Sequence, residues 1–119
     1  MVPMRIYVAG QLSNKRGTDK RTTTKVVTDY IQNVHKLCQA ASRLRRRGHY
    51  PYLPGLDLLL GLVVGDWEED EYRELGMEFL EVCDAVLVIS WSSGVDAEVR
   101  MARDLNIPVY VSEEEVPDE

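Results

Sequence analysis

The chain has 119 residues, of which 45% are hydrophobic and 29% charged, and its formal net charge is −6. This length suits one domain over residues 1–119, with a core of its own but without a second lobe. The negative net charge argues against a nucleic acid polymer as partner, because affinity for a phosphate backbone depends on basic side chains.

Targeting and membrane segments are not evident. The most apolar stretch, "LDLLLGLVV", carries Asp57, lies among glycines and is far shorter than the about 20 residues that cross a bilayer. The start, "MVPMRIYVAG", lacks the apolar segment and cleavage site of a signal peptide. We therefore expect a cytoplasmic protein with no membrane partner.

Metal and disulfide chemistry are not expected either. Cys38 and Cys83 lie in helix-like segments without CxxC or Cys/His spacing, so both are predicted to be buried thiols. His35 and His49 have neither ligand nor triad spacing. We predict no metal and no cofactor.

The first half of the chain indicates a strand, a long helix and a second strand. Residues 5–9, "RIYVA", are rich in β-formers and precede a turn at Gly10. Residues 22–48 have helical periodicity from a threonine cap to a glycine at the C-terminus. Residues 49–54, "HYPYLP", suit a short edge strand, because prolines interrupt a ladder.

The second half continues the alternation. Residues 55–65 are ambiguous between a short helix and a packed loop, and residues 66–85 form a second long helix that begins with acidic side chains. The unbroken apolar run at 85–91 is typical of a strand covered on both faces. A helix over 94–106 and a strand over 108–112 complete the pattern.

This alternation predicts a single α/β domain with a flavodoxin-like or Rossmann-like fold. Its core is a parallel sheet of four to five strands flanked by helices and connected by right-handed crossovers. Ligands of such sheets bind beyond the carboxyl ends of the strands, where the strand order reverses. Here those ends are Gly10 with the loop after it, the segment around Pro54, and "WSSG".

Two of these ends have residues that suit an anion. Ser92, Ser93 and Gly94 stand between a buried strand and a helix, where backbone N–H groups and the helix dipole favour a phosphate. The alternative is a plain helix cap, with Ser93 as N-cap and Asp96 as the capping-box carboxylate. The loop "YVAGQLSNKRG" lacks both the dinucleotide and the Walker spacing, so it is either a generic phosphate loop or a polar loop.

Glu98 is the most unusual residue of the last helix. It shares an apolar stripe with Val95, Ala102 and Leu105, whereas a surface glutamate usually lies on the other face. In the first turns of a helix the dipole is expected to keep its pKa low, so that it is ionised and able to act as a nucleophile. The alternative is a buried glutamate that is hydrogen-bonded to tyrosines or backbone.

Charged clusters elsewhere have plainer interpretations. The basic run at 43–49 closes a helix, where cations favour the dipole, and the C-terminal "SEEEVPDE" is interpreted as a solvated tail. The acidic run 66–71 is mostly a solvated helix start, of which one member can reach the site as an acid/base partner. Tyr7, on the first strand, is most often a core residue by its type.

Four segments together resemble the nucleoside 2-deoxyribosyltransferase-like superfamily, which includes the 2′-deoxynucleoside 5′-monophosphate N-glycosidases and many uncharacterised small proteins. They are "RIYVAG", "GHYPYLP", "CDAVLVISW" and "SSGVDAEVRMARDLNIPVYV". The most specific part is S-x-G-V-x-x-E, followed by alanine four residues later. The resemblance implies an oligomeric domain, a dimer or larger, that cleaves or transfers the N-glycosidic bond of a small-molecule nucleoside or nucleotide.

The resemblance also implies roles for individual residues. Glu98 matches the catalytic glutamate and Tyr7 the tyrosine that orients it. Ser92 and Gly94 match positions that hold a 5′-phosphate. The loop at Gly10 and Ser93, singled out above by their place at the strand ends, would complete that subsite. Ser92 favours a nucleotide, since the transferase branch has aspartate there.

Position 76 departs from the pattern. Gly76 stands where the hydrolase branch carries an aspartate, so Asp66, Asp70 or another acid of that segment must substitute, or the reaction is not efficiently catalysed. The leading hypothesis is therefore an N-glycosidase or deoxyribosyltransferase-like enzyme. The alternatives are a non-catalytic nucleotide-binding or sensing module and an interaction subunit without a ligand.

Overall fold

The computed structural model describes residues 3–12 and 22–118. Its strands are β1 (Arg5–Ala9), β2 (Tyr50–Tyr52), β3 (Ala85–Val88) and β4 (Val109–Tyr110). They form one four-stranded sheet in the order β2-β1-β3-β4, and every pairing is parallel. The predicted single α/β domain with a parallel sheet is confirmed. No helix in the described ranges is long and apolar enough to cross a membrane.

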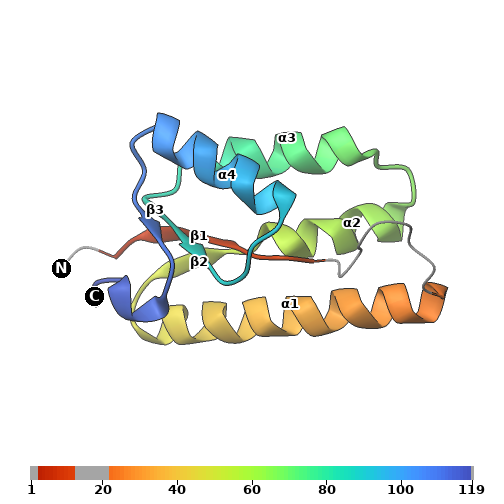
Figure 1. Cartoon of the computed structure of the whole chain (residues 1–119), viewed down its shortest axis with the longest axis horizontal. Coiled ribbons are helices and arrows are strands. Elements are labelled where there is room, and N and C mark those ends of the chain that lie inside the picture. Colours follow the sequence, from red (N-terminus) through yellow and green to blue (C-terminus); the bar gives the residue numbers. More distant parts are fainter. Residues whose placement is uncertain (1–2, 13–21, 119) are drawn as a thin grey trace.

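Helices cover both faces of this sheet (Figure 1). Helix α1 (Thr23–Arg46) lies on one side, and α3 (Glu69–Leu80) and α4 (Ser93–Asp104) lie on the other. The ambiguous segment at 55–65 is helical: a 3-10 turn, η1 (Pro54–Leu56), leads into α2 (Asp57–Val64). A second 3-10 turn, η2 (Glu113–Glu115), follows β4.

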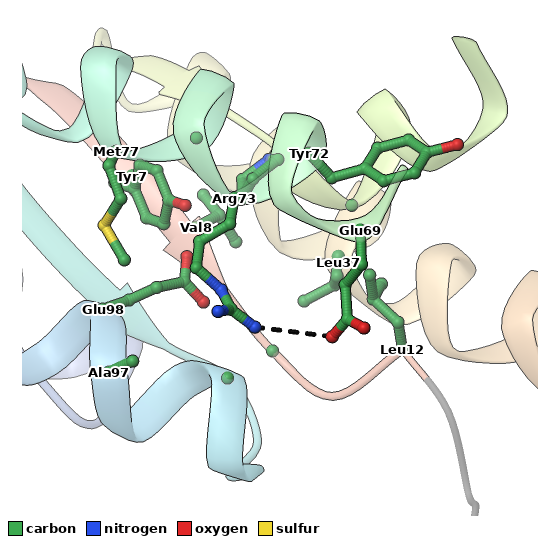
Figure 2. Close-up of a pocket in the computed structure, with 15 residues that line it drawn as sticks. Tyr7, Val8, Leu12, Leu37, Glu69, Tyr72, Arg73, Met77, Ala97 and Glu98 are labelled. Atoms are coloured by element: carbon green, nitrogen blue, oxygen red, sulfur yellow. Dashed lines mark hydrogen bonds and ion pairs between the residues drawn. The ribbon is translucent and has the colours of Figure 1, made fainter. Parts of the chain in front are cut away.

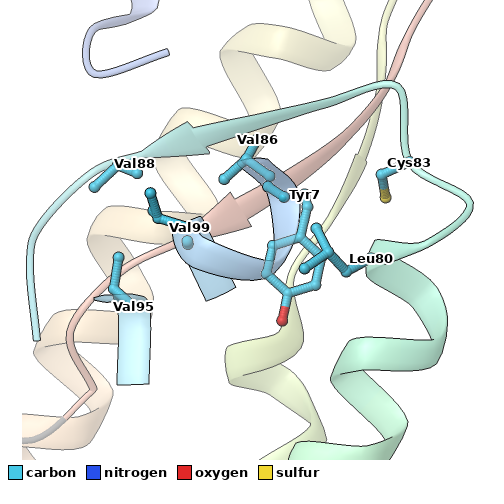
Figure 3. Packing of buried hydrophobic residues seen from close by; sticks show 9 residues of the cluster. Tyr7, Leu80, Cys83, Val86, Val88, Val95 and Val99 are labelled. Carbon is cyan, nitrogen blue, oxygen red and sulfur yellow. The ribbon is translucent and has the colours of Figure 1, made fainter. Parts of the chain in front are cut away.

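The central strands alternate their side chains between two cores. Tyr7 and Ala9 of β1 point to the α3 and α4 side, where they pack with Val86, Val95 and Val99 (Figure 3). Ile6 and Val8 point to the α1 side and pack with Leu37 and Leu44. Because successive strand residues face opposite ways, this register places the Tyr7 ring between the sheet and the two later helices.

Capping residues set the bounds of the helices. The Thr22 side chain accepts a hydrogen bond from the Lys25 N–H and starts α1, and Gly48, with a φ of 93°, lets the chain leave it. Helix α3 is shorter than predicted, because Glu68 and Glu71 form a capping box that starts it at Glu69.

The predicted solvated tail is wrong. Val116 is only 2% exposed and belongs to the α1-side core. Arg43 binds Glu113 through two hydrogen bonds of 2.7 Å, and Arg47 donates to the backbone oxygens of Glu113 and Val116. The basic end of α1 and the acidic C-terminal segment, which look independent in the sequence, therefore bind each other.

His49 holds the same end of the molecule. Its imidazole is fully buried, accepts from the Met4 N–H at 3.1 Å and lies 2.7 Å from the Pro117 oxygen. Since Nδ1 is the acceptor, Nε2 carries the proton and donates to Pro117. His49 thus ties the first strand to the C-terminal segment.

The two thiols differ from each other. Cys83 is buried as predicted, and burial raises its pKa to about 11. Cys38 is only partly buried, so the prediction of two buried thiols holds for one of them.

Candidate active site

A cavity of about 270 Å³ lies at the carboxyl end of β1, between α3 and α4 (Figure 2). Strand β1 is central, and the chain leaves it toward β2 on one side and later reaches β3 on the other. The cavity therefore occupies the point where strand order reverses, which is the usual ligand position in this fold class. Its walls include Tyr7, Gly10, Pro54, Gly55, Glu69, Tyr72, Arg73, Gly76, Met77, Gly94 and Glu98.

A second, wider pocket of about 640 Å³ adjoins this cavity and is called here the outer pocket. It is lined by residues 10–12, Glu69, residues 91–95 and Glu98. Of the residues that the structure describes, five line both spaces: Gly10, Leu12, Glu69, Gly94 and Glu98. The structure thus brings together six of the predicted site residues: Tyr7, Gly10, Ser92, Ser93, Gly94 and Glu98.

Tyr7 and Glu98 meet in the cavity. The Tyr7 ring is 2% exposed, and Figure 2 shows its hydroxyl directed toward the Glu98 carboxylate. Burial, and then the negative charge of Glu98, raise the pKa of Tyr7, so that its hydroxyl stays protonated and acts as the donor. The glutamate on the apolar stripe is therefore paired with a buried tyrosine.

The expectation of a low pKa for Glu98 is wrong. Burial raises the pKa of its carboxyl, and the hydrogen bond from Tyr7 only partly opposes this rise. The dipole of α4 does not compensate, because its effect falls off within the first turn and Glu98 lies beyond that turn. Leu105 also departs from the expected inward stripe, since it lies past the end of α4 and is 45% exposed.

Gly76 lies against the Tyr7 hydroxyl. A β-carbon built at position 76 would lie 3.0 Å from the phenolic oxygen, closer than ordinary van der Waals contact. Position 76 is buried on α3, so the tyrosine and the glycine fit each other. An acid at this position would need Tyr7 to move.

Asp66 and Asp70, the predicted acid partners, do not reach the cavity. Both are exposed and neither lines it or the outer pocket. Asp66 precedes α3, and Asp70 points elsewhere on that helix. The acid of α3 that lines both spaces is instead Glu69, the first residue of this helix.

Helical spacing explains this substitution. Glu69, Arg73 and Gly76 are four and then three residues apart, so they lie on one face of α3. Counting back from Gly76 along that face would have selected Glu69 from the acidic run. The Arg73 guanidinium pairs with Glu69 at 3.4 Å.

The cap of α4 lies one residue earlier than predicted. Ser92, not Ser93, is the N-cap, and its hydroxyl accepts from the Val95 N–H at 3.2 Å. The first N–H groups of a helix have no intrahelical acceptor, so those of Ser93 and Gly94 remain available to a ligand. A β-carbon at Gly94 would approach no heavy atom closer than 3.8 Å. The glycine therefore opens this end of the helix toward the pockets.

Ser90, which no sequence pattern singled out, joins the loops after β1 and β3. Its hydroxyl accepts from the Gln11 N–H at 2.8 Å. A β-carbon at Gly10 would lie 2.5 Å from a methyl group of Leu37 and 3.2 Å from the Ser90 oxygen, so any larger residue would have to displace the Leu37 side chain. Lys15 and Arg16 belong to the loop for which a phosphate loop and a polar loop were both considered, and they lie outside the described residues.

Tyr52 packs against the Tyr7 ring and is itself held by Asp57; no sequence pattern identified either residue. The Tyr52 hydroxyl donates to the Asp57 carboxylate at 2.5 Å, and the rings of Tyr7 and Tyr52 are 5.6 Å apart. Phe79 stacks on the other side of Tyr52 at 4.8 Å. This aromatic row restricts the position of the Tyr7 hydroxyl.

Comparisons with known proteins add no relative. No protein-family model matches the chain, and neither the curated proteins nor the solved structures give a match. Among the described residues, no group of three or more His, Cys, Asp or Glu side chains is placed to hold a metal ion.

Proposed function

We propose that this protein cleaves or transfers the N-glycosidic bond of a nucleoside 5′-monophosphate. The observation that carries the proposal is the pairing of Glu98 with Tyr7 in a cavity at the carboxyl end of the central strand. A carboxylate beneath the sugar stabilises the oxocarbenium-like transition state of glycosidic cleavage. The resemblance of the S-x-G-V-x-x-E segment supports the same chemistry.

In this mechanism the Glu98 carboxylate attacks the anomeric carbon while the bond from that carbon to the base nitrogen breaks. The bonding electrons leave with the base, which takes up a proton as it departs. Water, or a second base, then displaces the glutamyl ester and regenerates Glu98. Tyr7 donates its hydrogen bond throughout and fixes which carboxylate oxygen faces the sugar.

The raised pKa of Glu98 affects this role in two ways. A more basic carboxylate is the stronger nucleophile once it is ionised, but a smaller fraction is ionised at a given pH. The hydrogen bond from Tyr7 offsets part of the second effect, because it favours the charged form. Tyr7 therefore contributes both orientation and charge stabilisation.

The phosphate would bind at the start of α4. Ser93 and Gly94 offer backbone N–H groups there, and Ser92 holds the first turn in place. The outer pocket extends from this helix end to Glu98, so one ligand can span both. This arrangement favours a 5′-monophosphate over a free nucleoside.

A second candidate is a nucleotide-binding or sensing module without catalysis. Gly76 favours it, since this position on α3, against the Tyr7 hydroxyl, carries no acid to assist the leaving base. The burial that raises the pKa of Glu98 also suits a glutamate that accepts and donates hydrogen bonds without reacting.

Base release separates these candidates. We would incubate three proteins with a panel of ribo- and deoxyribonucleoside monophosphates and follow free base by chromatography. They are wild type, Glu98→Gln and the control Asp104→Asn, which changes an exposed site on the same helix. The enzyme hypothesis expects release by wild type and the control and none by Glu98→Gln. Equal release by wild type and Glu98→Gln contradicts the enzyme hypothesis. Binding of a nucleotide without release of base favours the sensing module. If no nucleotide raises the melting temperature of the protein, a ligand-free interaction subunit is favoured.

We also infer that the protein associates with copies of itself, through α2. Leu59, Leu62 and Val63 of this short helix are between 52% and 78% exposed. Apolar side chains gathered on one helix are typical of a covered surface. Light scattering after size exclusion should give a dimer or larger for wild type and a monomer for Leu62→Glu; a monomeric wild type contradicts the inference.

A further inference from the structure

The pockets carry an unfavourable charge for the phosphate that the proposed function requires. Glu69 and Glu98 line both the cavity and the outer pocket. Across the described residues, Arg73 is the one positively charged side chain that lines either space. A dianionic phosphate near two carboxylates is repelled unless a cation compensates, so Arg73 becomes important for anion binding.

Arg73 is already engaged, but loosely. Its guanidinium lies 3.4 Å from a Glu69 carboxylate oxygen, and the two side chains are 61% and 87% exposed. Figure 2 shows this ion pair in the wall of the cavity, with the Arg73 guanidinium near the Glu98 carboxylate. Exposed pairs four residues apart on a helix change an equilibrium by only about twofold, so this pair is easily exchanged.

Glu69 does not depend on Arg73. It is the first residue of α3, where the positive end of the helix dipole favours a carboxylate. The capping box of this helix is made by Glu68 and Glu71, so the Glu69 side chain is not part of the cap. Arg73 can therefore leave Glu69 without exposing an unfavourable charge.

We propose that Arg73 exchanges Glu69 for the phosphate of the bound nucleotide, so that the pair selects phosphorylated ligands over nucleosides. This inference rests on the proposed function and names a specificity residue for it. A bidentate guanidinium–phosphate contact is worth about tenfold to a hundredfold in affinity, well above the about twofold that the exposed pair supplies. The exchange is thus favourable for a phosphate and has no counterpart for a nucleoside.

Opposite effects of two substitutions test the exchange. The dissociation constants of one 2′-deoxynucleoside, its 5′-monophosphate and inorganic phosphate are measured by calorimetry for wild type, Arg73→Gln and Glu69→Gln. Arg100→Gln, an exposed arginine on α4 that lines neither pocket, is the control.

Arg73→Gln should weaken the monophosphate and inorganic phosphate at least about tenfold and change the nucleoside by less than about twofold. Glu69→Gln should tighten both phosphate ligands by about twofold or more, because it removes a competitor and a repelling charge. The control should leave all three affinities unchanged.

Several results overturn the proposal. Equal weakening of nucleoside and nucleotide by Arg73→Gln makes Arg73 a structural residue, and weaker phosphate binding in Glu69→Gln contradicts the exchange. Each can occur in a protein that still releases base in a Glu98-dependent way, so the proposed function survives them. If wild type binds neither nucleoside nor nucleotide, the proposed function fails and this inference fails with it.

Discussion

The hydroxyl of Tyr7 lies beside the backbone of Gly76, and a β-carbon at that position would stand 3.0 Å from the phenolic oxygen. Contacts this short require one partner to move. The Tyr7 ring is 2% exposed and packs against Tyr52, so it has little freedom to do so. Glycine at position 76 thus preserves the approach of Tyr7 to Glu98.

Gly76→Ala tests this fit. In the interior of a helix alanine is about 1 kcal/mol more favourable than glycine, but here the added methyl group meets the Tyr7 hydroxyl. We expect the gain to be cancelled in the wild-type background and to appear, at about 0.5 to 1 kcal/mol, in the Tyr7→Phe background. Urea unfolding of the four proteins measures it. Equal stabilisation in both backgrounds means that the hydroxyl does not restrict position 76.

Glu98→Gln should stabilise the protein at neutral and alkaline pH. Because burial raises the pKa of Glu98, the folded state binds its proton more tightly than the unfolded state, and stability falls as the pH rises through the two values. Glutamine keeps an acceptor for Tyr7 without the charge. We expect a gain of about 1 kcal/mol near pH 8 that disappears near pH 3, where Glu98 is protonated. A loss of stability at pH 8 contradicts this account.

The proposed reaction should have a pH–rate profile whose acidic limb lies at higher pH than for an ordinary glutamate. The nucleophile must be ionised, so kcat/KM should fall as the pH drops through the raised pKa of Glu98. Tyr7→Phe removes the hydrogen bond that lowers this pKa, and we expect the limb to move to higher pH along with an overall loss of rate of about tenfold or more. If the acidic limb of Tyr7→Phe stays at the wild-type pH and only the rate falls, Tyr7 orients Glu98 without changing its pKa.

Sequence patterns predicted the architecture because its signals are local. The β-rich run at 5–9, the apolar run at 85–91 and the helical periodicity between them each depend on near neighbours. Strand alternation then determines that Tyr7 and Ile6 face different cores. The proximity of Gly10, Glu98 and Ser92 followed from strand ends that meet at one edge of a parallel sheet.

Other features depend on contacts distant in sequence, which periodicity does not encode. The pKa of Glu98 follows from burial by neighbouring elements, whereas the helix dipole is a property of its own helix alone. The hydrogen bond from Tyr52 to Asp57 depends on the direction in which η1 turns the chain. The ion pair of Arg43 with Glu113 joins residues that are 70 positions apart in the sequence. Glu69 was within reach of sequence reasoning, since helical spacing from Gly76 identifies its face.

The C-terminal segment supplies the last prediction, because it is part of the core. Val116 is 2% exposed and packs with the α1-side cluster, whereas Val111, five residues earlier, is 55% exposed. Val116→Ala removes two buried methyl groups and should lower the free energy of unfolding by about 2 kcal/mol. Val111→Ala makes the same chemical change at an exposed site and should stay within about 0.5 kcal/mol of wild type.

Urea unfolding of the two variants shows whether the C-terminal segment is packed on the domain or is a solvated tail. Arg47 holds the backbone oxygens on both sides of this segment, so we expect the loss in Val116→Ala to reduce the cooperative transition of the whole domain rather than to release the terminus alone. A variant with the wild-type midpoint would mean that the segment contributes nothing to stability, in spite of its burial. A midpoint that falls without a change in the urea dependence indicates that the segment unfolds together with the sheet.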